Sequence, residues 1–166
     1  MLGMLMALAA MVLSACAPSL GQPVVPTVGY MPEDWYLSAE EAYPSLEAED
    51  GTRWGLIEYM DQVDYDFVQI YYGDMPSELI GRENDSDALI ARAIWESITF
   101  DPEETGTMVI GGRLAGYAKA YDPVYDVYDM EIVFVIDSTC IDIYAYYDAT
   151  SEDEAQVVSL INSIRP

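Results

Sequence analysis

Histidine is absent from the 166-residue sequence, and lysine occurs once, at Lys119. Without histidine the chain cannot form a Ser-His-Asp or Cys-His arrangement, and it has no imidazole base or histidine-containing zinc site. A glycine-rich phosphate-binding loop with a lysine is also missing, because Gly111-Gly112-Arg113 fits a turn better. We therefore expect a protein that is not an enzyme. The alternative left open is a small hydrolase that uses paired carboxylates.

Basic residues are scarce as a group, since 6 lysines and arginines stand against 30 acidic residues, for a net charge of −24. This balance excludes nucleic acid as a partner, because neutralising phosphates requires clustered lysine and arginine. It also argues against docking on an anionic membrane through a basic patch. Acidic surfaces poor in lysine are similar to those of proteins from saline habitats, where salt screens self-repulsion. An acidic protein outside the cytoplasm has the same composition, and both explanations stay open.

Charge is missing altogether from residues 1–13, which are mostly leucine, methionine, alanine and valine. The run is shorter than the roughly 20 apolar residues that cross a bilayer, and it is typical of the hydrophobic region of a signal peptide. The next residues, Leu13-Ser14-Ala15-Cys16, resemble the lipobox of prokaryotic lipoproteins, although no lysine or arginine precedes the apolar run. The resemblance implies a diacylglycerol on the Cys16 sulfur and cleavage just before this residue.

Lipidation at Cys16 predicts an extracytoplasmic protein that is attached to the membrane through its lipid. Two acyl chains anchor a protein stably, whereas one chain is marginal. The second cysteine, Cys140, stands among apolar residues and is expected to be a small buried side chain.

Residues 1–15 are thus predicted to be a lipoprotein signal peptide, residues 16–32 a tether, and residues 33–166 a single domain. Four prolines lie in the tether, without an apolar period, which is typical of an extended and loosely ordered linker. The domain is long enough for one core and too short for two.

The first strands of the domain are predicted from aromatic and β-branched residues. A short strand is expected at 35–37, followed by a helical turn at 38–41. Residues 53–60 and 63–72 predict a hairpin. Its apolar alternation shifts after Phe67, which indicates a bulge or burial on both faces.

Two helices are predicted from apolar spacings of three and four residues. The first runs over 86–99, with an aspartate or serine of Asp85-Ser86-Asp87 as its cap. The second begins with Ser151-Glu152-Asp153-Glu154, in which Ser151 and Glu154 form a capping box.

The remaining segments predict strands joined by tight turns, at 108–110, 114–121, 127–136 and 140–147. Met130, Ile132, Phe134 and Ile136 are expected on one face of the third. Strands, a helix, more strands and a final helix predict an α+β fold. We expect an antiparallel sheet flanked by helices, in an α/β/α sandwich.

Residues 107–164 carry a family resemblance. They read Thr-Met-Val-Ile-Gly-Gly-Arg-Leu-Ala-Gly-Tyr, then the strands, then Ser-Glu-Asp-Glu-Ala and a helix ending Asn162-Ser163-Ile164. This order, with the entry Pro32-Glu33-Asp34-Trp35, resembles the PsbP-like family, named for an extrinsic protein of photosystem II. The resemblance implies an antiparallel sheet between helices in a short lipoprotein. Because the chain has no histidine, no metal-ligand set of the family transfers to it.

Two acidic clusters could supply oxygen ligands for Ca²⁺. The first precedes the 86–99 helix and contains Glu83, Asp85 and Asp87. It fails as an EF-hand, because Ala88 stands where glycine is required and Ile94 where glutamate is required; helix capping explains it better. The second contains Asp122, Asp126 and Asp129, which form either a metal site or a solvated turn.

Tyrosine is abundant, with 14 residues. Interleaved with aspartate, these rings could form a platform for a glycan or a protein, although tyrosine is also a common strand residue. The candidate surface consists of Tyr117, Tyr121, Tyr125 and Tyr128.

The sequence therefore predicts a lipid-anchored, extracytoplasmic protein with a non-enzymatic binding or scaffold domain of PsbP-like type, an unknown protein partner and no bound cofactor. A low-affinity calcium-responsive module and a small carboxylate-dependent hydrolase are the alternatives.

Overall fold

The computed structural model describes residues 22–47, 51–97 and 101–166, so the predicted signal peptide and Cys16 lie outside the described residues. Nine strands, two α-helices and one short 3₁₀ helix are described. In chain order they are β1 Thr27–Val28, β2 Trp35–Glu47, β3 Arg53–Asp61, β4 Phe67–Gly73, η1 Ser77–Leu79, α1 Ser86–Glu96, β5 Glu104–Ile110, β6 Arg113–Asp122, β7 Val127–Ile136, β8 Thr139–Asp148, α2 Ser151–Asn162 and β9 Ile164–Arg165. Among the described residues, no helix is long and apolar enough to cross a membrane.

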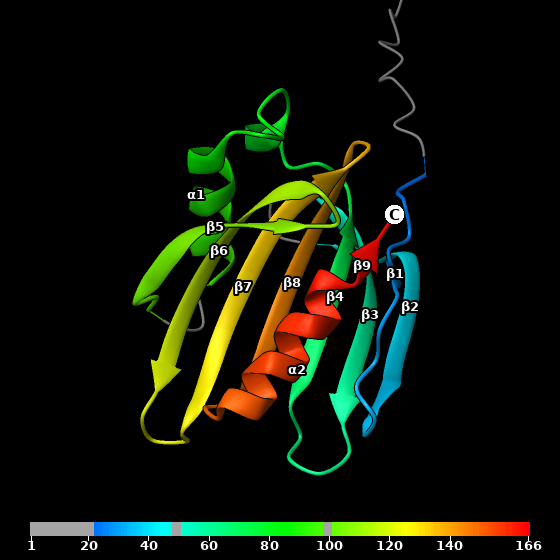
Figure 1. Ribbon diagram of the computed structural model, residues 1–166. Helices are drawn as coiled ribbons and strands as arrows, with labels where there is room; N and C mark the ends of the chain where they lie inside the picture. Colours follow the sequence, from blue (N-terminus) through cyan, green and yellow to red (C-terminus); the bar gives the residue numbers. More distant parts are fainter. Residues whose placement is uncertain (1–21, 48–50, 98–100) are drawn as a thin grey trace, which may run out of the picture.

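Seven strands form one antiparallel sheet in the order β2-β3-β4-β8-β7-β6-β5 (Figure 1). Most neighbours in the sheet are also neighbours along the chain, and the pairing of β4 with β8 joins the first half of the domain to the second. The short strands β1 and β9 form a separate antiparallel pair. The predicted α+β class with an antiparallel sheet is confirmed.

The two helices pack on opposite faces of the sheet. On one face α2 buries Val157, Leu160 and Ile161 against a core that includes Ile132 and Ile143. On the other face α1 lies over β5, β6 and β7, and its Leu89 and Ala93 pack with Val133 and Val135. Because alternate residues of a strand point to opposite faces, β7 supplies both cores. Met130, Ile132, Phe134 and Ile136 share the α2 face, as predicted.

Gly116 in β6 lets α1 approach the sheet closely. A Cβ atom at this position would lie 2.3 Å from the backbone carbonyl carbon of Leu89 and 2.4 Å from the nitrogen of Ile90. Only glycine permits so close an approach of a helix backbone to a strand. The short distance between α1 and β6 therefore depends on glycine at position 116.

Residues 22–32, the described part of the predicted tether, lie against the domain instead of extending freely from it; residues 16–21 of the tether lie outside the described residues. The amide of Val24 donates to Thr139 Oγ1 at 2.8 Å, and the amide of Gly29 donates to the Ser163 carbonyl at 3.1 Å. Val24 and Val28 pack against the α2-side core. The composition suggested a linker because these apolar residues are few and irregularly spaced, but β9 and the β7–β8 turn provide partners for them.

Two local predictions in the first half are wrong. Residues 38–41 form part of strand β2 rather than a helical turn, because β3 pairs with residues 39–41 after a register shift at Ser38. The second strand of the hairpin begins at Phe67, not at residue 63. The alternation shifts because the residues before Phe67 form a loop and not a strand. In this loop Tyr65 has a positive φ of 66° and Val63 is exposed.

Both predicted helices exist, with small differences at their ends. Asp85 caps α1 by accepting from the amides of Asp87 and Ala88, and the described part of the helix ends at Glu96. The cap of α2 is Thr150, whose side chain accepts from the Asp153 amide, so the predicted capping box lies one residue too late. The Thr150 hydroxyl also donates to the Asp153 carboxylate, whereas the Thr150 amide donates to the Asp148 carbonyl, so the reciprocal backbone bond of a capping box is not formed here.

Candidate binding face

The α1 side of the sheet is covered over only half its width. In the described residues α1 packs on β5, β6 and β7, while no α-helix lies over the same side of β3, β4 and β8 (Figure 1). One end of these strands is covered there, where Leu79 of η1 shares a buried cluster with Trp54 and Cys140. We call this uncovered area the open face. It is formed by the partly exposed α1-side residues of the three strands and by Asp129 of β7, namely Leu56, Glu58, Met60, Phe67, Gln69, Tyr71, Asp129, Tyr144 and Tyr146. All of them are partly exposed.

Three aromatic rings lie together on the open face. Phe67 and Tyr146 are directly paired across β4 and β8, and their rings stack at 5.3 Å with an angle of 11°. Tyr144 meets Phe67 edge-on at 5.5 Å. Such pairs stabilise one another beyond simple burial. The rings are therefore fixed in place as a platform.

Polar side chains beside the rings are held by hydrogen bonds to one another. Tyr71 donates to Gln69 Oε1 at 2.9 Å, and Gln69 Nε2 donates to Glu58 Oε2 at 2.6 Å. Ser38 of β2 donates to the other oxygen of Glu58. A separate bond runs from the Tyr144 hydroxyl to Asp129. The open face thus presents oriented carboxylates next to aromatic rings.

A pair of buried carboxyl groups lies at the inner edge of the open face. Glu131 of β7 and Asp142 of β8 are each only 7% exposed, and their side chains hydrogen-bond to each other. Burial raises the pKa of Asp142 to about 7, and burial together with the neighbouring Asp142 raises the pKa of Glu131 well above its usual value. Two adjacent buried carboxyl groups cannot both ionise cheaply. The pair therefore retains a proton near neutral pH.

The charges around this pair come from α1 and η1. Arg92 is almost fully buried, and its guanidinium forms ion pairs with Glu78, at 2.7 Å, and Glu96. Arg92 favours the ionised form of Asp142, while Glu96 opposes it.

Burial also raises the pKa of Tyr71, to about 12, and that of the Cys140 thiol. Cys140 is buried, as its sequence context predicts.

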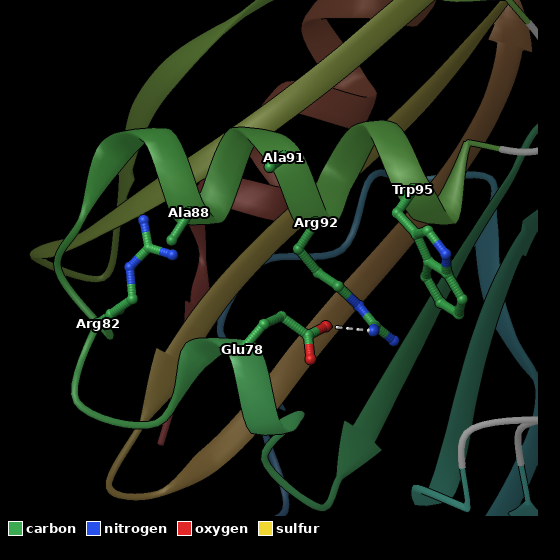
Figure 2. Close-up of a pocket in the computed structure, with 6 residues that line it drawn as sticks. All are labelled: Glu78, Arg82, Ala88, Ala91, Arg92 and Trp95. Carbon is green, nitrogen blue, oxygen red and sulfur yellow. Dashed lines mark hydrogen bonds and ion pairs between the residues drawn. The ribbon is translucent and has the colours of Figure 1, made fainter.

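A hollow of about 430 Å³ opens between η1 and α1 (Figure 2). Arg92 reaches across it to Glu78, and the Arg92 guanidinium carbon lies 4.1 Å from the centre of the Trp95 ring, which is half exposed. Arg82 also lines the hollow and is paired with Asp85 at 2.8 Å. Because acidic partners neutralise both arginines, this is not a strong anion site. Neither Glu131 nor Asp142 lines it, so the buried pair has no substrate pocket here.

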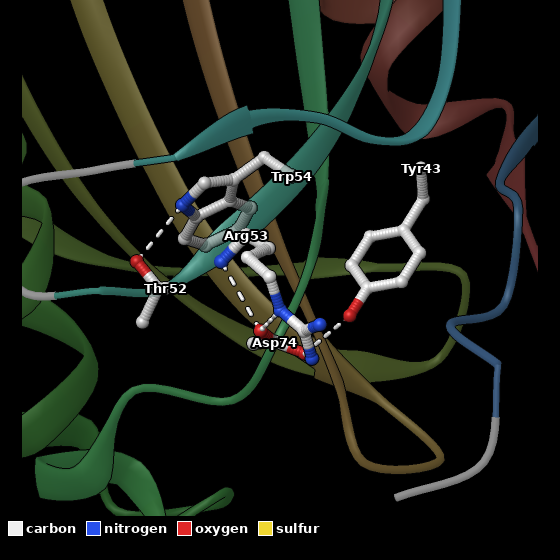
Figure 3. A network of polar contacts seen from close by, with 5 residues as sticks. All are labelled: Tyr43, Thr52, Arg53, Trp54 and Asp74. Carbon is white, nitrogen blue, oxygen red and sulfur yellow. Dashed lines mark hydrogen bonds and ion pairs between the residues drawn. The ribbon is translucent and has the colours of Figure 1, made fainter.

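A polar network lies where β3 begins and β4 ends, and it holds these strands to β2 (Figure 3). Asp74 accepts hydrogen bonds from the Arg53 Nε at 2.9 Å and from the Tyr43 hydroxyl at 2.7 Å. The Trp54 indole donates to Thr52 Oγ1 at 2.9 Å. These contacts tie β2 to the end of the β3–β4 hairpin and use one of the few cations in doing so.

The predicted metal cluster does not come together. Asp122 accepts from the Val124 amide at 2.7 Å, Asp126 accepts from Tyr121 at 2.7 Å, and Asp129 accepts from Tyr144 on the open face. Among the described residues, no group of three acidic or cysteine side chains is placed to hold a metal ion. Of the first cluster, Asp85 caps α1, as expected.

The four predicted surface tyrosines separate into two groups. Tyr117, Tyr121 and Tyr128 project on the α2 side of the sheet, where Tyr117 and Tyr128 pack against the core. Tyr125 lies in the β6–β7 turn and is 71% exposed. They do not form one platform. The clustered aromatic residues are instead Phe67, Tyr144 and Tyr146, on the other face.

Sequence reasoning missed the open face because its residues come from strands far apart in the chain. Only the pairing of β4 with β8 brings Phe67 next to Tyr146. A weak local signal existed, since Glu131 and Asp142 interrupt otherwise apolar strands. Charged residues at such positions indicate a face that lacks a full apolar cover.

Comparison with models of known protein families finds no match, and a search of curated proteins finds none either.

Proposed function

We propose that this protein is a lipid-anchored, extracytoplasmic binding protein of PsbP-like type that holds its partner on the open face. The observation that carries the proposal is the fixed cluster of Phe67, Tyr144 and Tyr146, left uncovered beside oriented carboxylates. Rigid aromatic side chains give large contact area at little entropic cost and are enriched in binding sites.

The position of the N-terminal segment supports an anchored orientation. Val24 bonds Thr139 at the start of β8, and the aromatic cluster lies seven residues further along that strand. At about 3.3 Å per residue, the cluster is roughly 20 Å from the point where the chain enters the domain. In Figure 1 this entry point and the C-terminus lie at the top, and the β3–β4 and β6–β7 turns lie at the bottom. A lipid on Cys16 would hold the aromatic end of the open face away from the membrane.

A binding role also fits the chemistry better than hydrolysis. The hydrolase alternative requires two carboxylates in a pocket open to a substrate and a water molecule. Glu131 and Asp142 are nearly inaccessible, and the hollow between η1 and α1 is lined by other residues. The accessible carboxylates of the open face, Glu58 and Asp129, accept hydrogen bonds from Gln69 and Tyr144.

The anchor is tested by replacing Cys16 with serine. We expect the wild-type protein in the membrane fraction, with a mass increase on Cys16, and the variant free of the membrane. An unmodified Cys16 in membrane-bound protein would contradict the anchor.

The binding face is tested by photo-crosslinking in the source cells. A benzophenone amino acid replaces Tyr146 on the open face, and in a control it replaces Tyr30, which is 50% exposed near the C-terminal end of α2. We expect one crosslinked species from position 146 and none from position 30. Excess unmodified protein should compete it away, and excess Phe67→Ser protein should not. Equal crosslinking from both positions would overturn the proposal.

A further inference from the structure

The open face contains acidic groups and aromatic rings but no cation. Among the described residues, no lysine or arginine extends from the α1 side of β3, β4 or β8. Lys119 projects on the opposite side, where it bonds Glu154 at 2.5 Å, and Arg53 is held by Asp74. Arg92 lies behind the face, within ion pairs to Glu78 and Glu96. No described cation of the chain therefore balances Glu58 and Asp129 on the face.

The open face brings aromatic rings and carboxylates together, and these are the two kinds of group that bind a guanidinium. A guanidinium stacks on an aromatic face and donates to carboxylate oxygens in the same plane. On the open face Asp129 is bonded to the hydroxyl of Tyr144, whose ring meets Phe67 edge-on. Lys119 shows the same chemistry on the other side of the sheet, with its ammonium 3.8 Å from the centre of the Tyr128 ring and bonded to a glutamate. The fold thus already pairs cations with tyrosine and carboxylate.

We propose that the partner bound by the open face is an arginine-bearing, extended polypeptide segment of a basic protein. This inference rests on the proposed function and adds the chemical class of the partner. The net charge of −24 steers a basic chain toward the domain and repels acidic ones, including a second copy of this protein. Arginine is preferred over lysine because only the planar guanidinium both stacks on a ring and donates two parallel hydrogen bonds.

The test uses residues 16–166 with Cys16→Ser, which contain every described element, and three 12-residue peptides as probes. The peptides alternate serine with arginine, lysine or glutamate. Amide shifts are mapped by NMR at 150 mM NaCl, where diffuse charge attraction is largely screened. We expect the arginine peptide to shift amides of β4 and β8 around Phe67 and Tyr146, the lysine peptide to bind at least threefold more weakly, and the glutamate peptide not to bind.

Variants then separate the site from general charge attraction. Glu58→Gln, on the face, should weaken binding of the arginine peptide several-fold. Glu47→Gln, at the exposed end of β2, removes the same charge elsewhere and should leave affinity unchanged. Phe67→Ser should also weaken binding, with its fold checked by circular dichroism. Because the amide map uses the unaltered face, the test stands even if this variant does not fold.

The outcomes distinguish the inference from the proposed function. Shifts spread evenly over the acidic surface, equal binding of the lysine and arginine peptides, or equal effects of the two glutamate variants would overturn the arginine-bearing partner. A specific crosslink from position 146 together with such results would leave the open face as a binding face for another partner. If neither the specific crosslink from position 146 nor specific binding of the arginine peptide is observed, the open face is not a binding face.

Discussion

Glu131 and Asp142 share a hydrogen bond between adjacent central strands, and both are nearly inaccessible to solvent. One oxygen of Asp142, Oδ1, is buried without a hydrogen-bond partner. An ionised and incompletely bonded carboxylate at such a position is costly. The pair therefore gives the fold a dependence on pH.

We expect stability to fall as the pH rises through about 7. The folded-state pKa of Asp142 and that of Asp66 are each raised to about 7, mainly by burial, so folding binds protons between the unfolded pKa, near 4, and pH 7. This stabilisation is complete below the unfolded pKa, is lost progressively as the pH rises toward the folded-state value, and does not change further above it; the loss between pH 5.5 and 7 is on the order of 2 kcal/mol per group. Urea unfolding between pH 5.5 and 8.5 measures it.

The matched variants for this prediction are Glu131→Gln and Asp129→Asn. Each removes one acidic group from β7, but only the first removes a member of the buried pair. We expect Glu131→Gln to reduce the pH dependence to the part that comes from Asp66, and Asp129→Asn to leave it nearly intact. An unchanged slope in Glu131→Gln would mean that the buried pair is not its source.

Gly116→Ala should destabilise the domain strongly. The added methyl group would meet backbone atoms of α1, which must move away from the sheet and lose part of its packing. We expect about 2–4 kcal/mol by urea unfolding. Gly106→Ala is the control, since its nearest neighbour is the flexible end of the Tyr117 side chain, at 2.9 Å. Similar losses in both variants would contradict the role given to Gly116.

Thr150→Ala should cost about 1 kcal/mol by removing the α2 cap, while Ser151→Ala should change stability by less than about 0.5 kcal/mol. The two residues are adjacent and similar in chemistry, so their comparison isolates the cap. A larger loss in Ser151→Ala would restore the capping box predicted from the sequence.

Removal of residues 17–32 should destabilise the domain by about 2 kcal/mol or more, because Val24 and Val28 pack on the core and β1 pairs with β9. A linker of the predicted kind would be removed without loss. Urea midpoints of residues 16–166 and of the same chain without residues 17–32 give the answer.

Salt should raise the melting temperature, because screening reduces repulsion within a domain of charge −24. Asp122, Asp126 and Asp129 bond three separate groups, so CaCl₂ and MgCl₂ at matched ionic strength should have equal effects. A larger shift with Ca²⁺ would indicate a specific cation site.

The sequence by itself determined the local elements and the class of fold. The periodicity of α1 and α2 and the alternation in β6, β7 and β8 are local properties, fixed by side-chain spacing over a few residues. Net charge and the absence of histidine likewise limited the chemistry without any structure. Local pattern also misled where long-range pairing decides, as at residues 38–41 and in the supposed tether.

Only the tertiary structure decided which residues meet. The open face depends on the pairing of β4 with β8 and on α1 lying over β5, β6 and β7, with Gly116 permitting its close approach. Phe67 and Tyr146 are 79 residues apart in the sequence and stack because their strands are hydrogen-bonded neighbours. Periodicity fixes which way a side chain points within its own strand, whereas its neighbour across the sheet is set by the order of the strands.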